Sequence, residues 1–463
     1  MLKRISLLLL LLLSTFTVPP ALAQGSGPVY IVQPGDTLSL IASLFNVTVN
    51  DLTAANPSLD PNFISQGQQI VIPGLEGVAG VLETEIIAFG DSLRSLSRRT
   101  QVADEQLKKL NRLVSPTELY VGISLIVPTQ EQQAPLNTRI TASTGESLLE
   151  LAVRQGSDPW TLASVNKLDG TWNAIPGDVL YSPIPGGQGN ATGLPSAFAR
   201  VTVDPLPLKQ GHTEAIRAQA KEGVTLSGAL VGMPIHFFQV NGEQVALQGV
   251  HALTEPGVHP FLVEATLPDG SKQSFEQMVL VTTGGYLSED IPLNDPSTLD
   301  PAVTEPELQN ITAVTAPATP TKYWDGIFTS PAVYTDCFTS RFGTRRSYKV
   351  LNSEIEIPGI HTGLDFCGGE GLQILAPAPG KVVFAAPLTV RGNATVIDHG
   401  WGVYSGFWHQ SQITVQVGET VQAGQVIGMV GGTGRATGAH LHWEVWVNGV
   451  QVDPLDWLGQ AFP

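Results

Sequence analysis

Apolar and polar residues follow two different periods along the chain. In the N-terminal third, apolar positions recur at helical spacing, as at Leu38, Ile41, Ala42 and Phe45, behind a Ser or Thr that can cap a helix. From residue 197 onward, short apolar stretches such as IHFFQV and HPFLVEATL alternate with Gly, Pro and Asn turn signals. The pattern predicts small mixed modules followed by β-rich domains with little helix.

The mixed region contains an internal repeat. Each of three copies has a short strand (YIVQ, EIIAF, RITAS), a Gly-Asp/Glu-Ser/Thr-Leu start signal, two short helices and a closing strand (QIVIP, SLIVP, VLYSP). Three kinds of anchor recur with one period of 55 residues: Gly35, Gly90 and Gly145; Asn56, Asn111 and Asn166; Pro73, Pro128 and Pro183. A fixed period held at several anchors indicates tandem βααβ modules, which we expect at residues 28–74, 83–129 and 138–185.

The first copy reads YIVQPGDTLSLIASLFNVTVNDLTAANP and later GQQIVIP. It resembles the LysM module, and the resemblance implies binding to glycans that contain N-acetylglucosamine. The second and third copies keep the scaffold with looser motifs. They are therefore either further glycan-binding modules or spacers that keep only the fold.

Two segments connect this array to the C-terminal region. The stretch GGQGNATGLPS predicts a flexible joint, and residues 197–283 predict a small β-sandwich that serves as a spacer or docking element. Its scattered histidines, His236, His251 and His259, do not predict a metal site. Residues 284–325 are rich in Pro, Asp, Glu and Thr, which predicts a linker with one short helix around Glu305 to Ile311. The alternative for this linker is a lid or inhibitory segment over the C-terminal domain.

The chain begins with an export signal. Lys3 and Arg4 precede an apolar run to Val18, and Ala21-Leu22-Ala23 completes the layout of a signal peptide over residues 1–23. An uncleaved N-terminal anchor is the alternative. The formal net charge of −17 disfavours nucleic acid as a partner. Export also permits a disulfide between the only two cysteines, Cys337 and Cys367, which are otherwise two free thiols.

Candidate chemistry is concentrated after residue 360. Five of the nine histidines lie there, at positions 361, 399, 409, 440 and 442. His361 and Asp365 occur in HTGLDF, and His440 and His442 lie on one face of a predicted strand. Two histidines and one carboxylate would hold Zn²⁺ with a fourth position open to water. Four protein ligands would close the site, so one of the two strand histidines is expected to stand off the metal and assist proton transfer.

The C-terminal region also contains six segments that follow one another in a family-like order: SRFGTRRSY, HTGLDF, APAPGKVVFA, VIDHGWGVYSGFWHQ, VQAGQVIGMVGGTGRATGAHLHWEVWVNG and DPLDW. Together they resemble the all-β catalytic domain of lysostaphin-type (LytM-like) zinc endopeptidases. The resemblance implies that His361, Asp365 and His442 bind zinc and that His440 and His409 are catalytic. We expect the domain at residues 326–463.

Some residues of the segment depart from the family pattern or lack a role in it. Phe407 and Gln410 stand where the family commonly has Tyr and Leu, so contacts to substrate on that side are expected to differ. His399 is expected to be structural. Arg345 and Arg346 are expected either to support a substrate carboxylate or to be solvated.

The sequence thus predicts an exported, zinc-dependent peptidoglycan endopeptidase that cuts stem or cross-bridge peptides and is tethered to glycan by its LysM-like modules. We expect it in the cell envelope, the periplasm or outside the cell, with no stable membrane span after signal cleavage. The alternatives are a non-catalytic wall-binding activator of another hydrolase and a structural wall protein.

Overall fold

The computed structural model describes residues 27–463 except residues 76, 130–135, 137, 142–145, 171–177, 185–192, 294–295 and 335. The predicted signal peptide and Gly145 lie outside the described residues. The chain forms two compact units. One comprises residues up to Glu85 with Glu105–Arg112 and Ile126–Ala134, and the other comprises the rest.

The first predicted module has the order strand, helix, helix, strand. Its elements are β1 (Val29–Ile31), α1 (Leu38–Phe45), α2 (Val49–Ala55) and β2 (Gln69–Val71). Thr37 caps α1 by accepting a hydrogen bond from Leu40 N, and Thr48 forms a capping box with Asp51 at the start of α2. The apolar face predicted from helical spacing is buried in one cluster with the strands.

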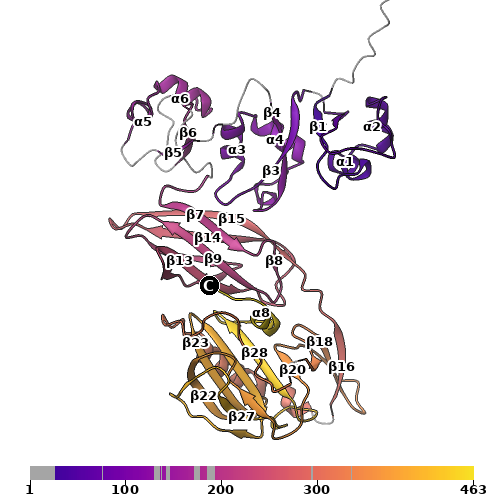
Figure 1. Ribbon diagram of the computed structural model, residues 1–463, viewed down its shortest axis with the longest axis vertical. Helices are drawn as coiled ribbons and strands as arrows, with labels where there is room; N and C mark the ends of the chain where they lie inside the picture. The colour runs from indigo at the N-terminus through magenta and orange to yellow at the C-terminus, as the bar shows by residue number, and fades with distance from the viewer. Residues whose placement is uncertain are drawn as a thin grey trace, which may run out of the picture. The chain divides into compact units, whose positions relative to one another are not determined.

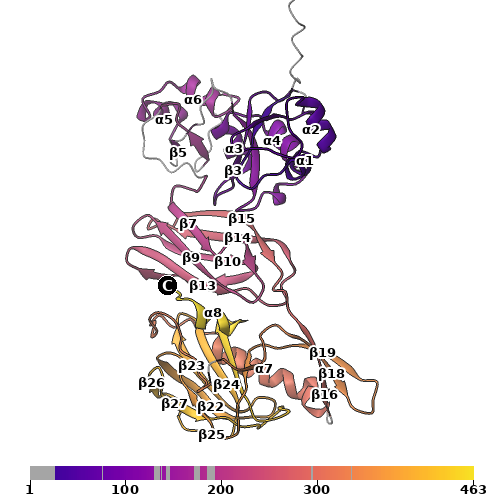
Figure 2. The ribbon, with the colours of Figure 1, turned by 45° about the vertical axis from the view of Figure 1, so that its right-hand side comes forward.

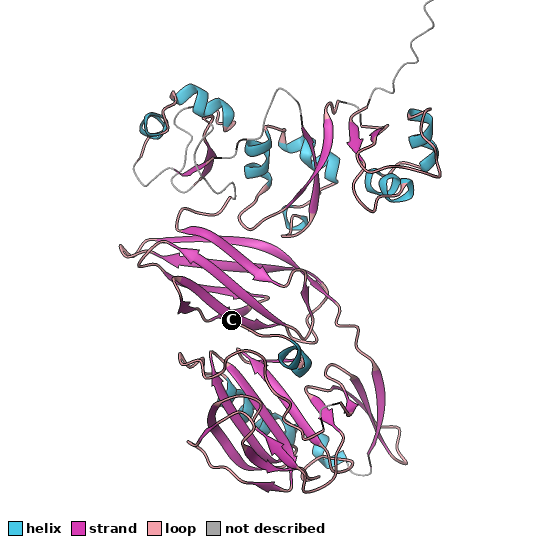
Figure 3. Cartoon of the chain, in the orientation of Figure 1, coloured by secondary structure: helices cyan, strands magenta, loops and turns pink. Residues whose placement is uncertain are grey.

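The next two segments repeat this order, as the paired helices in Figure 3 show. Their elements are β3 (Val81–Ile86), α3 (Leu93–Thr100), α4 (Asp104–Asn111), a 3₁₀ turn (Pro116–Glu118), β4 (Ser124–Thr129), β5 (Arg139–Thr141), α5 (Leu148–Arg154), α6 (Pro159–Val165) and β6 (Val179–Tyr181). Strands β2, β1, β3 and β4 form one sheet in that order, and β5 pairs with β6.

The repeated asparagine has the same contacts in all three segments. Each side-chain amide donates to the carbonyl four residues earlier and to a carbonyl in the closing strand, whose N–H donates back to the same side chain. The strand partners are Val71, Ile126 and Tyr181 for Asn56, Asn111 and Asn166. The amide therefore joins the second helix to the closing strand, which explains why this residue keeps the period of the repeat.

The region from residue 198 to 282 contains two facing sheets (Figure 1), whose strand pairs are antiparallel except for the parallel pair of β15 with β8. One sheet has the order β11-β10-β14-β15-β8 and the other β12-β13-β9-β7. The strands are β7 (Phe198–Asp204), β8 (Leu208–Lys209), β9 (Thr213–Ala220), β10 (Thr225–Leu230), β11 (Met233–Ile235), β12 (Phe238–Val240), β13 (Glu243–Gly249), β14 (Gly257–Thr266) and β15 (Lys272–Thr282). Phe198, Phe261 and Phe275 pack between them, edge to face.

The C-terminal region is built on a large sheet with the order β17-β20-β28-β24-β23-β22-β26, beside the smaller sheets β21-β27-β25 and β16-β18-β19. Its elements are β16 (Ser288–Leu293), a 3₁₀ turn (Pro296–Leu299), α7 (Pro301–Thr315), β17 (Phe338–Ser340), β18 (Arg345–Val350), β19 (Glu356–Ile360), β20 (Leu364–Phe366), β21 (Gln373–Leu375), β22 (Gly380–Leu388), β23 (Gly392–Gly400), β24 (Val403–Gln410), β25 (Gln412–Ile413), β26 (Thr420–Val421), β27 (Val426–Met429), β28 (Leu441–Val447), β29 (Val450–Val452) and α8 (Pro454–Gly459).

The described residues of the segment predicted as a linker, residues 284–325, pack against this region. Strand β16 pairs in parallel with β18, and α7 extends well beyond the short helix expected around Glu305 (Figure 2). Ile311 is fully buried in a cluster with side chains of β23, β24 and β28. The Glu307 carboxylate accepts hydrogen bonds from the backbone N–H groups of Val390 and Arg391. The segment is therefore not the plain linker that its composition suggested, because it packs on the C-terminal domain through these contacts.

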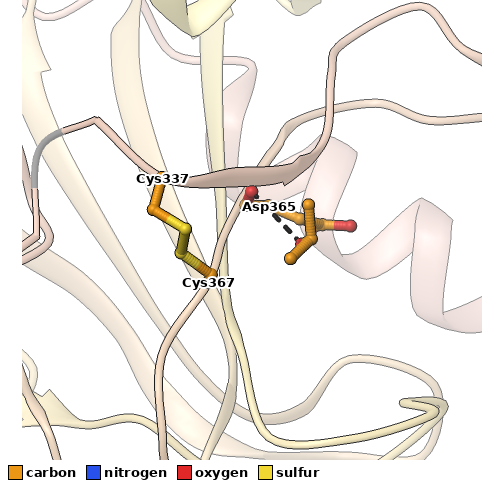
Figure 4. The surroundings of a disulfide bond; sticks show 4 residues. Cys337, Asp365 and Cys367 are labelled. Atoms are coloured by element: carbon orange, nitrogen blue, oxygen red, sulfur yellow. Dashed lines mark hydrogen bonds between the residues drawn. A yellow bond between two sulfur atoms is a disulfide. The ribbon is translucent and has the colours of Figure 1, made fainter.

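A disulfide joins Cys337 to Cys367, with their Cα atoms 5.5 Å apart. It connects the ends of β17 and β20 beside Asp365, as Figure 4 shows. In the described part of the chain, no single helix has the length and apolar content to cross a bilayer. Helices α1 and α2 meet that test only as a pair bent by 97°.

Candidate metal centre

Two neighbouring strands of the large sheet bring the predicted ligands together. Asp365 of β20 lies directly opposite His442 of β28 in the antiparallel register, so their side chains are cross-strand neighbours on one face. His361 reaches the same place from the end of the β18–β19 hairpin, where its backbone N–H donates to the carbonyl of Thr344. The site is therefore assembled from segments that are up to 81 residues apart in sequence.

Three side-chain atoms converge there. Oδ1 of Asp365 lies 2.7 Å from Nδ1 of His442 and 3.1 Å from Nε2 of His361, and the two ring nitrogens are 3.1 Å apart. Ligand atoms around a tetrahedral zinc ion are separated by roughly 3.3–3.5 Å, as bond lengths near 2.1 Å require. The three atoms thus need to separate by less than about 1 Å to share one ion.

Hydrogen bonds outside the cluster orient both rings. Nδ1 of His361 donates to the carbonyl of Arg341 (2.8 Å), which leaves Nε2 with its lone pair toward the cluster. Nε2 of His442 faces the carboxylate of Glu444 at 3.3 Å, which directs Nδ1 toward Asp365. Outer hydrogen bonds of this kind are the usual means of fixing the ligating nitrogen of a metal-binding histidine.

The electrostatics of the cluster favour a bound cation. Burial disfavours a charge on His442, but Asp365 and Glu444 outweigh burial and raise its pKa to about 9. Burial likewise opposes ionisation of Asp365, yet the neighbouring histidines hold the pKa of its carboxyl well below its usual value. A cation placed among Oδ1, Nδ1 and Nε2 would satisfy the same three atoms, so the residues present fit a divalent metal.

His409 and His440 lie beside the cluster rather than in it. Nε2 of His440 is 3.6 Å from Oδ1 of Asp365, and its Nδ1 donates to the carbonyl of Gly438. His409 donates from Nδ1 to the carbonyl of Thr433, and burial lowers its pKa to about 3. His409 also has a positive φ of 62°, a conformation that is costly for a residue with a side chain and that is often found at functional sites.

A second group of potential ligands, His409, His440 and His442, overlaps the first. It lacks a carboxylate, so it offers a cation no negative charge. The group that contains Asp365 also has the oriented nitrogen of His361. The group of His361, Asp365 and His442 is therefore the better match to a divalent cation.

Two charged residues contact the cluster in ways that the sequence did not predict. Glu444 is buried, and its carboxylate accepts from Thr362, Trp446 and Gln451 besides facing His442. Arg346 donates to Oδ2 of Asp365 and to Glu289. A signal for Glu444 was present, since it follows His442 by two positions on the same strand face.

The remaining candidates lie away from the cluster. His399 is fully buried between the carbonyl of Pro379 and the hydroxyl of Ser405, in agreement with a structural role. Phe407 and Gln410 are also fully buried. Their departure from the family pattern therefore lies in the core of the domain and not on the surface of the site.

The cluster lines a cleft of about 670 Å³. Histidines 361, 409, 440 and 442 and Asp365 line one part of it. The β16 segment contributes Ile291, Pro292 and Leu293, and three arginines, Arg346, Arg391 and Arg435, also reach it. A peptide-sized ligand could thus contact the metal-binding cluster, an apolar wall and positive charge in one cleft.

Comparison with known proteins identifies domains of two families in the chain. Residues 359–454 match Peptidase family M23, and residues 30–73 and 86–128 match the LysM domain. The DD-carboxypeptidase/endopeptidase Mpg of Neisseria meningitidis is 37% identical over 130 residues, which cover 28% of this chain and 29% of that protein. The peptidoglycan DD-endopeptidase ShyB of Vibrio cholerae is 34% identical over 117 residues, which cover 25% of this chain and 26% of that protein. The match thus spans less than a third of each of these relatives.

Solved structures show related chains. A Pseudomonas aeruginosa chain assigned to peptidase M23 is 28% identical and covers 56% of this chain and 96% of that chain, with a TM-score of 0.41. Lysostaphin from Staphylococcus simulans is 30% identical and covers 26% of this chain and 48% of that chain, with a TM-score of 0.23. On the family matches, the chain contains a lysostaphin-type peptidase domain of family M23 together with LysM domains.

Proposed function

We propose that this protein is an exported, zinc-dependent endopeptidase that hydrolyses peptides of bacterial peptidoglycan. The observation that carries the proposal is the convergence of Asp365, His361 and His442 within 3.1 Å of one another in a cleft that also contains His409 and His440. The names of the relatives, which include DD-endopeptidases, favour a D,D-peptide bond as the target.

His361, Asp365 and His442 would hold the metal through Nε2, Oδ1 and Nδ1. Zinc bound there would supply a Lewis acid and lower the pKa of a bound water. Glu444 and the carbonyl of Arg341 keep the two rings in the ligating orientation. Arg346 holds the second oxygen of Asp365, so that Oδ1 remains directed at the histidines.

The two other histidines would move protons. His409 is neutral at physiological pH, because burial depresses its pKa, and its Nδ1–H is engaged by Thr433, so its Nε2 is available as a proton acceptor. The side chain of His440 is 18% exposed. One of these two histidines would accept the proton of the attacking water, and the other would donate to the developing oxyanion or leaving amine.

The LysM modules would hold the enzyme on its substrate. Binding to glycan strands raises the local concentration of the linked peptides, as in any tethered system. The third segment, at residues 138–185, lies outside the LysM matches. Its strand and helix order and its asparagine contacts equal those of the first two segments, and we propose it as a third module of the same type.

The test is release of new amino termini from purified peptidoglycan by the chain without residues 1–23. We expect release that disappears with a chelator and in His442→Ala, and that returns when Zn²⁺ is added to the chelated wild-type protein. Wall binding without release under any zinc condition would instead establish the non-catalytic activator, and the proposal would be wrong.

A further inference from the structure

The three arginines of the cleft differ in how their charge is used. Arg346 is paired with Glu289 and Asp365, and Arg391 is paired with Glu307 at 3.0 Å. Arg435 forms no ion pair among the residues that the structure describes. Among the described residues, it is therefore the one arginine of the cleft lining whose charge no carboxylate neutralises by direct contact.

Arg435 is nevertheless held in place. Its backbone N–H donates to the carbonyl of Val390, its Nη1 donates to the carbonyl of Thr298 at 2.9 Å, and its guanidinium lies 5.2 Å from the centre of the Tyr348 ring. These contacts come from three separate segments. They fix the guanidinium, and most of its N–H groups have no hydrogen-bond partner among the described residues.

An unpaired, partly buried cation is costly to maintain. Burial lowers the pKa of Arg435, which means that its charged form loses hydration in the cleft. An arginine stays protonated even so, and a guanidinium binds a carboxylate with two parallel hydrogen bonds. The two carboxylates that line the cleft do not pair with Arg435. Glu444 accepts hydrogen bonds from four donors, and Asp365 faces the histidines.

We propose that Arg435 binds a free carboxylate of the peptide substrate and thereby sets which peptides the cleft accepts. This proposal rests on the proposed function, since it assigns a specificity residue to the same site. Peptidoglycan peptides offer such carboxylates on their acidic residues and at their carboxyl termini. The arrangement also gives the ordered segment before the domain a role, because Thr298 of that segment orients the guanidinium.

The experiment uses a cross-linked stem-peptide dimer and matched dimers in which one free carboxyl at a time is a carboxamide. Affinities are measured by calorimetry on the chain without residues 1–23 and without metal, so binding is observed without hydrolysis. We expect one amidation to weaken binding by about 10- to 100-fold, as loss of a charged hydrogen-bond pair does. Arg435→Gln should bind the acid and amide forms equally, and Arg435→Lys should keep part of the difference because it keeps the charge without the planar fork.

Arg345→Gln is the matched control, since Arg345 is exposed on β18 and outside the cleft lining. It should discriminate between acid and amide as the wild-type protein does. Equal affinity of the wild-type protein for all dimers would overturn the proposal. So would a loss of affinity in Arg435→Gln that is the same for acid and amide, because that would indicate contacts to peptide carbonyls.

Turnover of the same dimers by the zinc-loaded protein separates this inference from the proposed function. We expect amidation and Arg435→Gln to raise KM far more than they change kcat. Acid-selective binding that depends on Arg435, with no cleavage of any dimer, would support the carboxylate site and overturn the proposed hydrolysis.

Discussion

At the scale of single residues, His440 and His442 share one strand face but have different surroundings. The side chain of His442 is 9% exposed and lies between Asp365 and Glu444, whereas that of His440 is 18% exposed and is oriented by the carbonyl of Gly438. Only His442 directs a nitrogen into the group formed with His361 and Asp365 at hydrogen-bond distance.

Replacing each histidine should therefore have different results. We expect His442→Ala to lose stoichiometric zinc, because one of the three proposed ligands is removed. His440→Ala should retain one zinc per chain and lose turnover by about 100- to 10,000-fold, as loss of a proton-transfer group does. Metal analysis of dialysed protein beside an endopeptidase assay checks both, and equal zinc loss in the two variants would contradict the division of roles.

Glu444→Gln tests the outer shell of the metal site. The change removes the charge that faces His442 and places amide hydrogens near the N–H groups of Trp446 and Gln451. We expect zinc affinity to fall by about 10- to 100-fold in a folded protein, as for other outer-shell partners of ligating histidines. Glu370→Gln, at an exposed position in the same domain, should leave zinc affinity unchanged in a competition titration with a chelating dye.

Spacing within one strand or one short motif predicted much of the site. HTGLDF and the alternation of His440 and His442 are local features, and the structure brings them together through the pairing of β20 with β28. The charge balance of the cleft could not be predicted in this way. The partners of an arginine come from segments far apart in the chain. The carbonyl of Thr298 accepts from Arg435, and the carboxylate of Glu307 pairs with Arg391.

At the scale of elements, α7 shows how composition can mislead. Pro, Asp, Glu and Thr residues made the segment resemble a linker, yet Glu307, Ile311 and Val314 follow helical spacing and face the large sheet. The helical period was therefore present, but it was short and broken by Pro306. Its partner surface on β23 and β24 could not be inferred without the tertiary structure.

Ile311→Ala tests the packing of this helix. Ile311 is fully buried, so its truncation should destabilise the domain by about 2–5 kcal/mol through lost burial and a residual cavity. Leu308 lies on the same helix with its side chain 46% exposed, and Leu308→Ala should cost less than about 1 kcal/mol. Calorimetric unfolding of the two variants checks the difference, and equal destabilisation would show that Ile311 does not anchor the helix.

At the scale of the whole molecule, the second compact unit joins the β-sandwich to the catalytic region through a continuous core. Val245 and Leu247 of the sandwich belong to the same buried cluster as Trp457, whose indole N–H donates to the hydroxyl of Thr213. The sandwich therefore packs directly against the C-terminal domain and does not merely separate domains along the chain. This contact could not be predicted from the chain, because nothing in either strand pattern specifies its partner surface.

The buried acid next to Thr213 should make stability depend on pH. Burial, with Asp456 and Asp204 nearby, raises the pKa of Glu214 to about 8. Since the folded-state pKa is above that of the unfolded chain, stability is fully present below pH about 4.5 and is lost as pH rises through 8. A shift of this size corresponds to a loss on the order of 5 kcal/mol.

Glu214→Gln removes the titration. We expect the variant to gain stability relative to wild type between pH 5 and pH about 8.5, where the wild-type carboxyl ionises, and to show no gain at acidic pH. Glu276→Gln, exposed on β15 of the same sandwich, serves as the control. Melting temperatures measured across this pH range test whether ionisation of Glu214 lowers stability. Parallel pH profiles for the two variants would show that it does not.

The disulfide between Cys337 and Cys367 would link the formation of the proposed metal site to the redox state of its surroundings. It fastens β17 to the strand that carries Asp365. In a reducing compartment, where disulfides are rare, this edge of the sheet would be held by short strand pairing alone and Asp365 would be less well positioned. With the proposed function, the metal site would reach its full affinity only where the disulfide forms, outside the reducing interior of the cell.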